Sequence, residues 1–431
     1  MLTDETIICL APDPWEGLWR NRHQIMTRLA RRNTVLYVEP RLYHTDVLRY
    51  LRTGRLKLAD LRQPLAWRYS ERSSSAAHGL WIYHDPYYAP VAGRFTGGWL
   101  TAALRRRAMA RTLRQIGAPV PPILWLVRPY YADVIGQYGE KLLVYHVTDE
   151  YSAYTHADHQ ALTRQQERAV LGRADLTIVT SPALLASKRP FNPHTCLVPN
   201  AVDYEGFQRS LAADRPIAPL AEAEAEVKAK AKDEPKPQPN LNHPPPIPRP
   251  RIGYSGALNE KIDFALLAHV ATSRPDWQLV LIGARDLFRQ PAKADPLAGL
   301  PNVHWLGRLP VTQLPPAIAS MDVCLLPYER NEWTANIDSL KLYEYLACGR
   351  PIVSTDVPVA HAFAEVVRIG RDPAEFVAQI AAALAAADQS HDNSAAATAR
   401  RKTIASQNTW DQRVATIETL LAEALHRKRE G

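Results

Sequence analysis

Two short segments in the second half of the chain combine glycine, lysine and carboxylate residues at spacings suited to phosphate binding. In the first segment, glycines stand at the end of an apolar run, and Lys261 follows five positions after Gly256. Glycine lets a phosphate approach the backbone closely, and a lysine can neutralise its charge. The spacing matches neither the dinucleotide fingerprint nor a P-loop, so a plain tight turn with a surface lysine is an equal interpretation.

The second segment predicts a short helix with a defined start and end. Asp338 or Ser339 is a natural N-cap, and Gly349 is a natural residue to end the helix, which predicts a helix over about 340–348. The first turn of such a helix offers backbone N–H groups to an anion.

Lys341 and Glu344 give this helix its chemistry. Lys341 lies beside the N–H groups of the first turn, which predicts a site for a diphosphate. Glu344, one turn further, could accept hydrogen bonds from a ribose diol, whereas the alternative is a solvated ion pair between Lys341 and Glu344.

Strands that alternate with helices must position these segments. Short apolar runs predict strands in both halves, at 6–11, 34–38, 123–127, 142–147, 176–180, 196–199, 251–254, 278–282, 303–306, 323–326, 352–354 and 366–369. Helices are predicted between them, among them 160–171 and 182–188. Buried strands alternating with helices indicate parallel sheets covered on both faces, so we expect two α/β sheets in series.

A change of composition divides the chain. Residues 215–250 hold ten of the 35 prolines and an Ala/Glu/Lys tract, neither of which supplies an apolar face for a core. The sequence therefore predicts a first Rossmann-like domain over 1–208, a disordered linker or insertion over 209–250 and a second Rossmann-like domain over 251–405. A closing helix within 406–431 has one apolar face, which we expect to pack back on the first domain.

The net charge of +8 is placed unevenly, because residues 41–117 carry 14 Lys/Arg against four Asp/Glu. A local basic field attracts phosphates, acidic glycans or an anionic bilayer. The region Arg94–Arg114 mixes aromatic and aliphatic residues with arginines, as interfacial helices do, and predicts an anionic membrane surface as partner. A solvated arginine face on a soluble helix is the alternative, and no recognition motif indicates nucleic acid.

Several classes of protein are excluded by what the sequence lacks. No apolar stretch approaches the roughly 18 residues of a spanning helix, and the acidic N-terminus lacks the basic region of a secretory signal. The four cysteines lie far apart with no C-x-x-C spacing, which favours reduced, buried thiols. We therefore expect a cytoplasmic protein, soluble or peripheral on the inner face of the membrane, without a metal site or a cofactor.

The block 341–353, Lys-Leu-Tyr-Glu-Tyr-Leu-Ala-Cys-Gly-Arg-Pro-Ile-Val, resembles the donor-site signature of group 1, family 4-like glycosyltransferases of the retaining GT-B type. Further segments resemble motifs of the same family, at 174–181, 198–203, 306–307, 321–323 and 410–413. Within the group the chain is similar to the bacterial polysaccharide or teichuronic-acid type, in which Tyr-His-Val-Thr-Asp-Glu-Tyr at 145–151 stands in for a characteristic motif.

The resemblance implies the GT-B fold, in which two Rossmann-like, doubly wound parallel-sheet domains face a cleft and a C-terminal helix follows. It also implies transfer of a sugar from a nucleotide-diphosphate-sugar donor to a glycan or lipid-linked acceptor, with retention, in cell-surface polysaccharide or glycolipid synthesis. Fold alone does not fix function. A non-catalytic GT-B partner subunit and a sugar-nucleotide epimerase of the same fold remain alternatives.

The resemblance assigns donor-binding roles to residues of the second domain. Glu344 would bind the ribose hydroxyls, and the diphosphate and sugar side would be bound by Ser339, Leu340, Lys341, Gly256 and Lys261. Two positions depart from the family pattern. Asn336 replaces one of the paired glutamates, and Ala257 replaces an arginine after Gly256. Both departures leave the identity of the sugar and the strength of catalysis open, and Asn336 can still bind a sugar hydroxyl.

The first domain would bind the acceptor. Retaining members need no protein base, because the leaving phosphate can accept the proton of the acceptor. If the reaction inverts, Asp149 or His146 after a strand end could act as the base, although both could equally be ordinary strand-end polar residues. Glu16 and Arg20, which follow the first strand, are predicted to face the acceptor.

Overall fold

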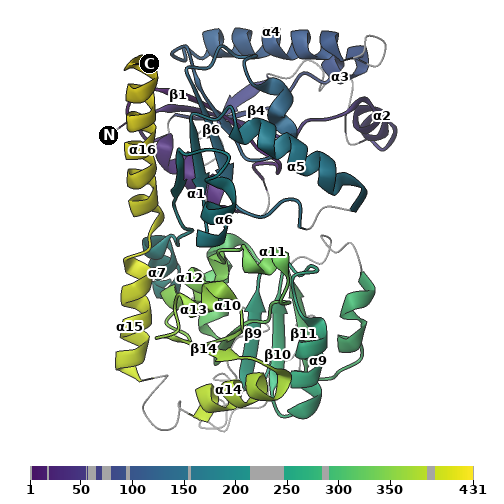
Figure 1. Cartoon of the computed structure of the whole chain (residues 1–431). Coiled ribbons are helices and arrows are strands. Elements are labelled where there is room, and N and C mark those ends of the chain that lie inside the picture. Colours follow the sequence, from purple (N-terminus) through teal and green to yellow (C-terminus); the bar gives the residue numbers. More distant parts are fainter. Residues whose placement is uncertain are drawn as a thin grey trace. The chain divides into compact units, whose positions relative to one another are not determined.

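The computed structural model describes residues 2–16, 19–54, 56, 65–69, 79–93, 98–153, 157–213, 247–283, 291–385 and 394–430. The chain forms two compact units (Figure 1). Unit 1 consists of Met1–Pro199 with Trp410–Gly431, and unit 2 consists of Asn200–Thr409. Each unit is built around a sheet of its own.

Unit 1 contains an eight-stranded sheet in the order β3-β4-β2-β1-β5-β6-β7-β8. All neighbouring strands pair in parallel except β3 with β4. The strands are β1 (Thr6–Leu10), β2 (Thr34–Val38), β3 (Ala66–Arg68), β4 (Leu80–Tyr83), β5 (Ile123–Leu126), β6 (Leu142–Val147), β7 (Leu176–Val179) and β8 (Thr195–Leu197). The strand order reverses between β1 and β5, and the carboxyl ends of strands beside such a reversal form the usual ligand site.

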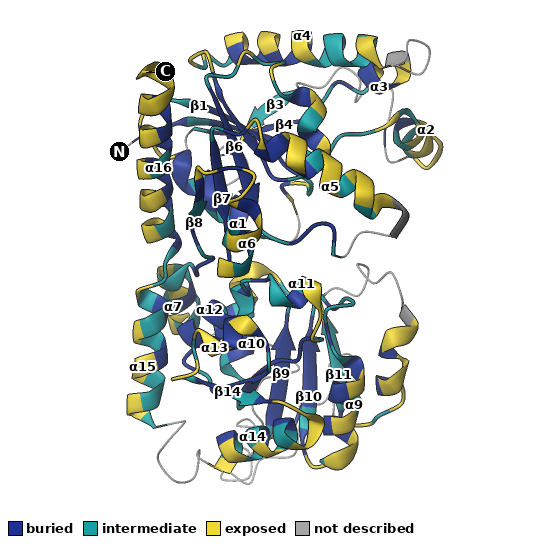
Figure 2. Ribbon diagram, in the orientation of Figure 1, coloured by how far each residue is buried: buried dark blue, intermediate teal, exposed yellow. Residues whose placement is uncertain are grey.

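Helices cover the sheet of unit 1, and its central strands are buried along their whole length (Figure 2). They are α1 (Asn21–Leu29), α2 (His44–Arg52), α3 (Tyr88–Gly93), α4 (Trp99–Gln115), η3 (Pro129–Val134), α5 (Ala157–Leu171), α6 (Pro182–Lys188) and α16 (Trp410–Glu430). The closing helix α16 is tied to this unit at both ends. Asp411 pairs with Arg28 at 2.9 Å, and Lys428 pairs with Asp175 at 2.6 Å.

Unit 2 contains a six-stranded, wholly parallel sheet in the order β11-β10-β9-β12-β13-β14. Its strands are β9 (Arg251–Ser255), β10 (Gln278–Ile282), β11 (Val303–Gly307), β12 (Val323–Leu326), β13 (Ile352–Thr355) and β14 (Val367–Gly370). Its helices are α7 (Tyr204–Ala212), α9 (Phe264–Ser273), η4 (Pro291–Leu297), η5 (Val311–Gln313), α10 (Leu314–Ala319), α11 (Glu332–Ala335), α12 (Leu340–Ala347), α13 (Pro358–His361), α14 (Pro373–Ala385) and α15 (Ala395–Ser406). The strand order reverses between β9 and β12.

The prediction of two α/β sheets in series is confirmed, and most strands begin and end within a residue of their predicted bounds. The elements β3 and β4 were not predicted, because each has at most four residues inside the basic stretch 41–117. The structure divides the chain at Pro199, and α7 runs across the predicted boundary at 208. Most of the predicted linker, 214–246, lies outside the described residues, as do residues 94–97 of the basic region.

None of the helices in the described part of the chain combines the length and the apolar character needed to cross a bilayer.

Candidate functional site

Each unit carries a polar cluster where the strand order of its sheet reverses. The unit 2 cluster consists of Gly256, Lys261, Tyr328, Ser339, Lys341 and Glu344, and it lies at the carboxyl ends of β9 and β12 and at the start of α12. The unit 1 cluster consists of Asp13, Arg20, Arg22, His23, Thr148 and Asp149, and it lies beyond the carboxyl ends of β1 and β6.

The first turn of α12 is held open by the residue that precedes it. Ser339 has the extended backbone of an N-cap, with φ −83° and ψ 115°, but its hydroxyl does not cap the helix. The hydroxyl instead hydrogen-bonds to the Tyr328 hydroxyl at 2.7 Å. Among the described residues, no side chain caps the first turn of α12. The N–H groups of Leu340 and Lys341 therefore remain available to an anion, whereas that of Leu342 donates to the Ser339 carbonyl at 3.1 Å.

The loop in front of α12 is fixed by Asn200. The backbone N–H of Asn200 donates to Asp338 Oδ2 at 2.5 Å, and Asn200 Nδ2 donates to the Asp338 carbonyl at 2.6 Å. The Tyr343 hydroxyl donates to Asp338 Oδ1 at 3.1 Å. The motif at 198–203 therefore positions the start of α12, a link that the sequence did not reveal.

Lys341 lies directly against the glycine that ends β9. A Cβ built on Gly256, whose φ is +151°, would lie 2.7 Å from Lys341 Cε. Lys341 Nζ also pairs with Glu344 Oε2 at 3.1 Å, and both side chains are less than a fifth exposed. The ion pair between Lys341 and Glu344, which was the alternative to ligand binding, is therefore present. It also keeps both side chains beside the uncapped first turn of α12.

The remaining predicted residues of unit 2 differ in how closely they join the cluster. Lys261 Nζ lies 5.4 Å from the centroid of the Tyr328 ring, so it belongs to the cluster. Leu340 is the first residue of α12. Asn336 ends α11, and its Nδ2 donates to the Glu332 carbonyl at 2.7 Å.

Sequence reasoning missed Tyr328 and Gly283. Tyr328 comes two positions after β12, at the carboxyl edge of the sheet, and that position alone could have identified it. Gly283 follows β10 with φ +155°, and a Cβ there would lie 1.7 Å from the Gly256 carbonyl oxygen. Two glycines are thus required side by side at this edge.

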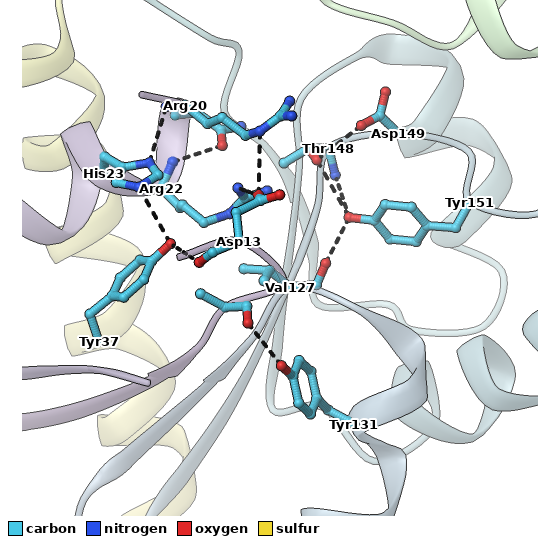
Figure 3. Close-up of polar contacts among 12 residues, drawn as sticks. Asp13, Arg20, Arg22, His23, Tyr37, Val127, Tyr131, Thr148, Asp149 and Tyr151 are labelled. Carbon is cyan, nitrogen blue, oxygen red and sulfur yellow. Dashed lines mark hydrogen bonds and ion pairs between the residues drawn. The ribbon is translucent and has the colours of Figure 1, made fainter. Parts of the chain in front are cut away.

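Figure 3 shows the unit 1 cluster, in which two arginines meet one carboxylate. Arg22, almost fully buried, pairs with Asp13, and Arg20 Nε lies 3.3 Å from the same carboxylate oxygen. Burial raises the pKa of Asp13, but Arg22, Arg20 and Arg128 outweigh it and hold this pKa below its ordinary value of 3.8. Asp13 is therefore ionised at neutral pH.

The imidazoles near this cluster are neutral. His23 Nδ1 accepts a hydrogen bond from the Arg20 backbone N–H at 3.0 Å, and burial with the nearby Arg22 lowers the pKa of His23 to about 4. The prediction placed His146 after a strand end, and this position is wrong. His146 lies inside β6 with 2% of its surface exposed, and burial lowers its pKa to about 3.

Asp149 follows β6 and, like Asp13, is a partly exposed acidic group near Arg20. The loop that carries it is braced: Thr148 donates its backbone N–H to the Tyr151 hydroxyl at 3.2 Å, and that hydroxyl donates to the Val127 carbonyl at 3.0 Å (Figure 3). Glu16 lies exposed in the loop after β1.

A buried ion triad lies next to this loop. Lys188 Nζ is 2.5 Å from Glu150 Oε2 and 2.9 Å from Glu167 Oε2, and all three side chains are less than a tenth exposed. Burial, with only one ammonium for two carboxylates, raises the pKa of Glu167. The triad fixes the residue that follows Asp149 and ties it to α5 and α6.

Sequence reasoning also missed Asp13, Arg22 and His23. Asp13 comes three positions after β1, so the strand end pointed to it. Among the described residues, no group of His, Cys, Asp and Glu is arranged to hold a metal ion.

The comparisons with known proteins agree with this geometry. Residues 249–389 match the protein-family model "Glycosyl transferases group 1". This segment is a group 1 glycosyltransferase domain. It contains the whole unit 2 cluster, and the predicted resemblance to group 1 GT-B glycosyltransferases is confirmed, whereas retention stays a prediction.

One curated relative matches part of the chain. TuaH of Bacillus subtilis, named as a teichuronic acid biosynthesis glycosyltransferase, is 31% identical over 107 residues, which is 25% of this chain and 27% of that protein. The match therefore spans about a quarter of the relative.

Solved structures share the fold of the whole chain. HepE from Anabaena in complex with UDP-glucose has a TM-score of 0.61 and 14% identity, over 98% of this chain and 99% of that chain. An α,α-trehalose-phosphate synthase (UDP-forming) from Burkholderia vietnamiensis has a TM-score of 0.60 and 11% identity over 100% of both chains. The GT-B fold with a C-terminal helix is confirmed.

Proposed function

We propose that this protein is a glycosyltransferase that moves a sugar from a nucleotide-diphosphate-sugar donor to a glycan or lipid-linked acceptor in cell-surface polysaccharide or glycolipid synthesis. The observation that carries the proposal is the open first turn of α12, with Lys341 against Gly256 and Glu344 one turn further. The group 1 domain and the UDP-sugar complexes of HepE support it.

In this proposal the successive parts of the donor bind to successive groups along α12. The N–H groups of the first turn and Lys341 bind the diphosphate, because both stabilise negative charge at the same place. When Lys341 turns to the phosphate, Glu344 is released from its ion pair and accepts hydrogen bonds from the ribose hydroxyls. Ser339 and Lys261 lie on either side of Tyr328, which keeps the loops of β12 and α12 together.

The reaction follows from these positions. With retention, the leaving phosphate accepts the proton of the acceptor hydroxyl, and the protein contributes orientation and charge stabilisation. With inversion, a carboxylate must accept that proton, and Asp149 is the base of the proposal because His146 is buried within β6. Asn336 contributes one hydrogen bond to a sugar hydroxyl.

The acceptor side includes a membrane surface. The helix α4 exposes Trp99, 68% accessible, and an arginine stripe of Arg107, Arg111 and Arg114 that lines one shallow concavity. Arg105 does not belong to the stripe, because it pairs with Asp85 at 2.8 Å. We propose that this face binds anionic lipid on the cytoplasmic side of the membrane, where a lipid-linked acceptor would be found.

The test is release and transfer of sugar by the purified protein. UDP- and GDP-sugars are incubated with and without membrane extract as acceptor, using wild type, Glu344→Ala, Lys341→Ala and the matched surface variant Glu365→Ala, since Glu365 lies exposed on unit 2. We expect one donor to be consumed by wild type and Glu365→Ala and to be left intact by the other two variants. Bound donor without turnover would favour a non-catalytic partner, and conversion of the donor to its epimer would favour an epimerase.

A further inference from the structure

The unit 1 cluster, taken together with the neighbouring Arg128, holds more cationic than anionic groups. The charges of Arg20, Arg22 and Arg128 all attract the Asp13 carboxylate. Asp149 is the second carboxylate, and its charge attracts Arg20. His23 adds no charge, because burial lowers its pKa to about 4. Three guanidinium groups therefore face two carboxylates.

Arg22 and Arg20 differ in their exposure to solvent and in their contact with Asp13. Arg22 is 4% exposed and pairs with Asp13 inside the unit. Arg20 is 35% exposed, and its guanidinium approaches the same carboxylate through Nε at 3.3 Å. Within the described residues, the one hydrogen bond that Arg20 donates comes from its backbone N–H, and its two terminal nitrogens donate none.

The guanidinium of Arg20 lies toward Asp149, the proposed base. Figure 3 shows its guanidinium extending past Asp13 in the direction of Asp149. Arg128 is partly exposed and is stacked 4.3 Å above the centroid of the Tyr151 ring. Its charge interacts electrostatically with both Arg20 and Asp13. The planar fork of a guanidinium matches the two oxygens of a carboxylate or phosphate.

We propose that the acceptor is an anionic sugar or glycolipid, whose carboxylate or phosphate is bound by the terminal nitrogens of Arg20, next to Arg128. The acceptor hydroxyl then lies on the side of Asp149. The inference rests on the proposed transferase function and adds the chemical class of the acceptor. A glycan uronate and a lipid or sugar phosphate offer the same anionic chemistry to Arg20.

The test uses matched neutral and anionic probes. Methyl glucoside is compared with methyl glucuronide, and glucose with glucose 6-phosphate, by calorimetric titration of the full chain. Wild type, Arg20→Gln, Arg20→Lys and Arg31→Gln are used; Arg31 lies at the other end of α1, 52% exposed and paired with Asp411, and serves as the matched control. We expect the anionic member of one pair to bind at least tenfold more tightly than its neutral partner, and the pair identifies carboxylate or phosphate as the source.

The variants assign that preference to Arg20. Arg20→Gln is expected to remove the tenfold preference, Arg20→Lys to restore part of it, and Arg31→Gln to leave it unchanged, with thermal melting as the check on folding. Equal binding of neutral and anionic probes by wild type, or no binding of either anion, overturns the inference. A preference that survives in Arg20→Gln overturns it as well.

A parallel titration with UDP and GDP separates this inference from the proposed function. If neither nucleotide binds to wild type, the transferase proposal fails whatever the sugar probes do. If Arg20→Gln lowers nucleotide affinity tenfold and keeps the preference for the anionic sugar, Arg20 serves the donor diphosphate, and the acceptor inference is overturned. Unchanged nucleotide affinity with a lost sugar preference is the expected result.

Discussion

The two polar clusters occupy the same place in their respective sheets but are built from different materials. In unit 2, Ser339, Lys341 and Glu344 belong to one helix start, and the strand ends contribute glycine. In unit 1, Asp13 and Arg20 come from the loop after β1 and form an ion pair, and Asp149 comes from a loop more than a hundred residues away. Backbone N–H groups suit a ligand part that never changes, whereas side chains in loops suit a part that differs among related enzymes.

The largest expected difference between the units is the cost of removing a buried charge. Lys188→Met leaves two buried carboxylates in unit 1 without their ammonium and should cost about 3–5 kcal/mol. Lys341→Met removes a more exposed pair in unit 2 and should cost about 1 kcal/mol or less. Hydrogen exchange of peptides from β6 and β9 measures each unit by itself.

Glu167→Gln is the control for this experiment, because it removes the excess carboxylate and keeps Lys188 paired with Glu150. It should cost less than Lys188→Met. Similar losses in the β6 peptide for Lys188→Met and Glu167→Gln would contradict the importance of the ammonium.

A second contrast concerns membrane binding, which is proposed for the exposed face of α4 in unit 1 and not for unit 2. Exchange of Arg107, Arg111 and Arg114 for glutamine should weaken binding to vesicles containing anionic lipid by about a hundredfold, since each surface cation contributes about 1 kcal/mol. Vesicle co-sedimentation at fixed salt measures this, with neutral-lipid vesicles as control. Equal sedimentation of the triple variant and wild type would remove the membrane from the proposal.

The pH dependence of stability should also differ between the units. The pKa values of His23 and His146 are about 4 and 3 in the folded chain against 6.5 in the unfolded chain. Below pH 6.5 the unfolded chain therefore binds more protons, and unit 1 loses stability as the pH falls toward 4, by up to about 1.4 kcal/mol per pH unit for each imidazole.

Exchange of β6 peptides from pH 7 to 4, corrected for the intrinsic rate, tests this slope. His146→Gln should reduce it. In unit 2, burial lowers the pKa of His304 as well, but that side chain lies on β11 at the sheet edge, so β9 should show a smaller slope. Parallel slopes for β6 and β9 would contradict the contrast.

The smallest expected effect separates backbone strain from a steric clash at the unit 2 cluster. Gly256→Ala and Gly299→Ala both place a side chain at positive φ, which should cost about 1 kcal/mol of stability at Gly299 and more at Gly256, where the new Cβ also clashes with its neighbours. Only at Gly256 does the new Cβ meet Lys341, so only this variant should lose nucleotide affinity, by about tenfold. Calorimetry with UDP and GDP checks this, and an equal loss in Gly299→Ala would contradict the contact.

The unit 2 cluster was largely predictable because its residues are close together in the sequence. Helical spacing places Lys341 and Glu344 within one turn, and the N-cap and the ending glycine mark the helix on either side. The hydrogen bonds from Asn200 to Asp338 join segments 138 residues apart, and no local pattern indicates them.

The unit 1 cluster was predictable only in part. Arg20 and Asp149 were identified because they follow strands, but the pairing of Asp13 with Arg22 depends on the path of the loop between β1 and α1. The strand 142–147 was predicted with its observed bounds, but the sequence did not show that the His146 ring is buried in the sheet against Trp125. Burial in the sheet, not spacing, decides its protonation.

The most direct test of the central claim, that the start of α12 binds a nucleoside diphosphate, is to titrate wild type with UDP, uridine and 2′,3′-dideoxy-UDP, and with the guanosine series in parallel. We predict that one diphosphate binds at least tenfold more tightly than its nucleoside and its dideoxy analogue. Lys341→Ala should lose the first preference and Glu344→Ala the second, because these groups bind the diphosphate and the ribose diol. If neither diphosphate binds, or if both variants keep both preferences, the assignment of this site is wrong.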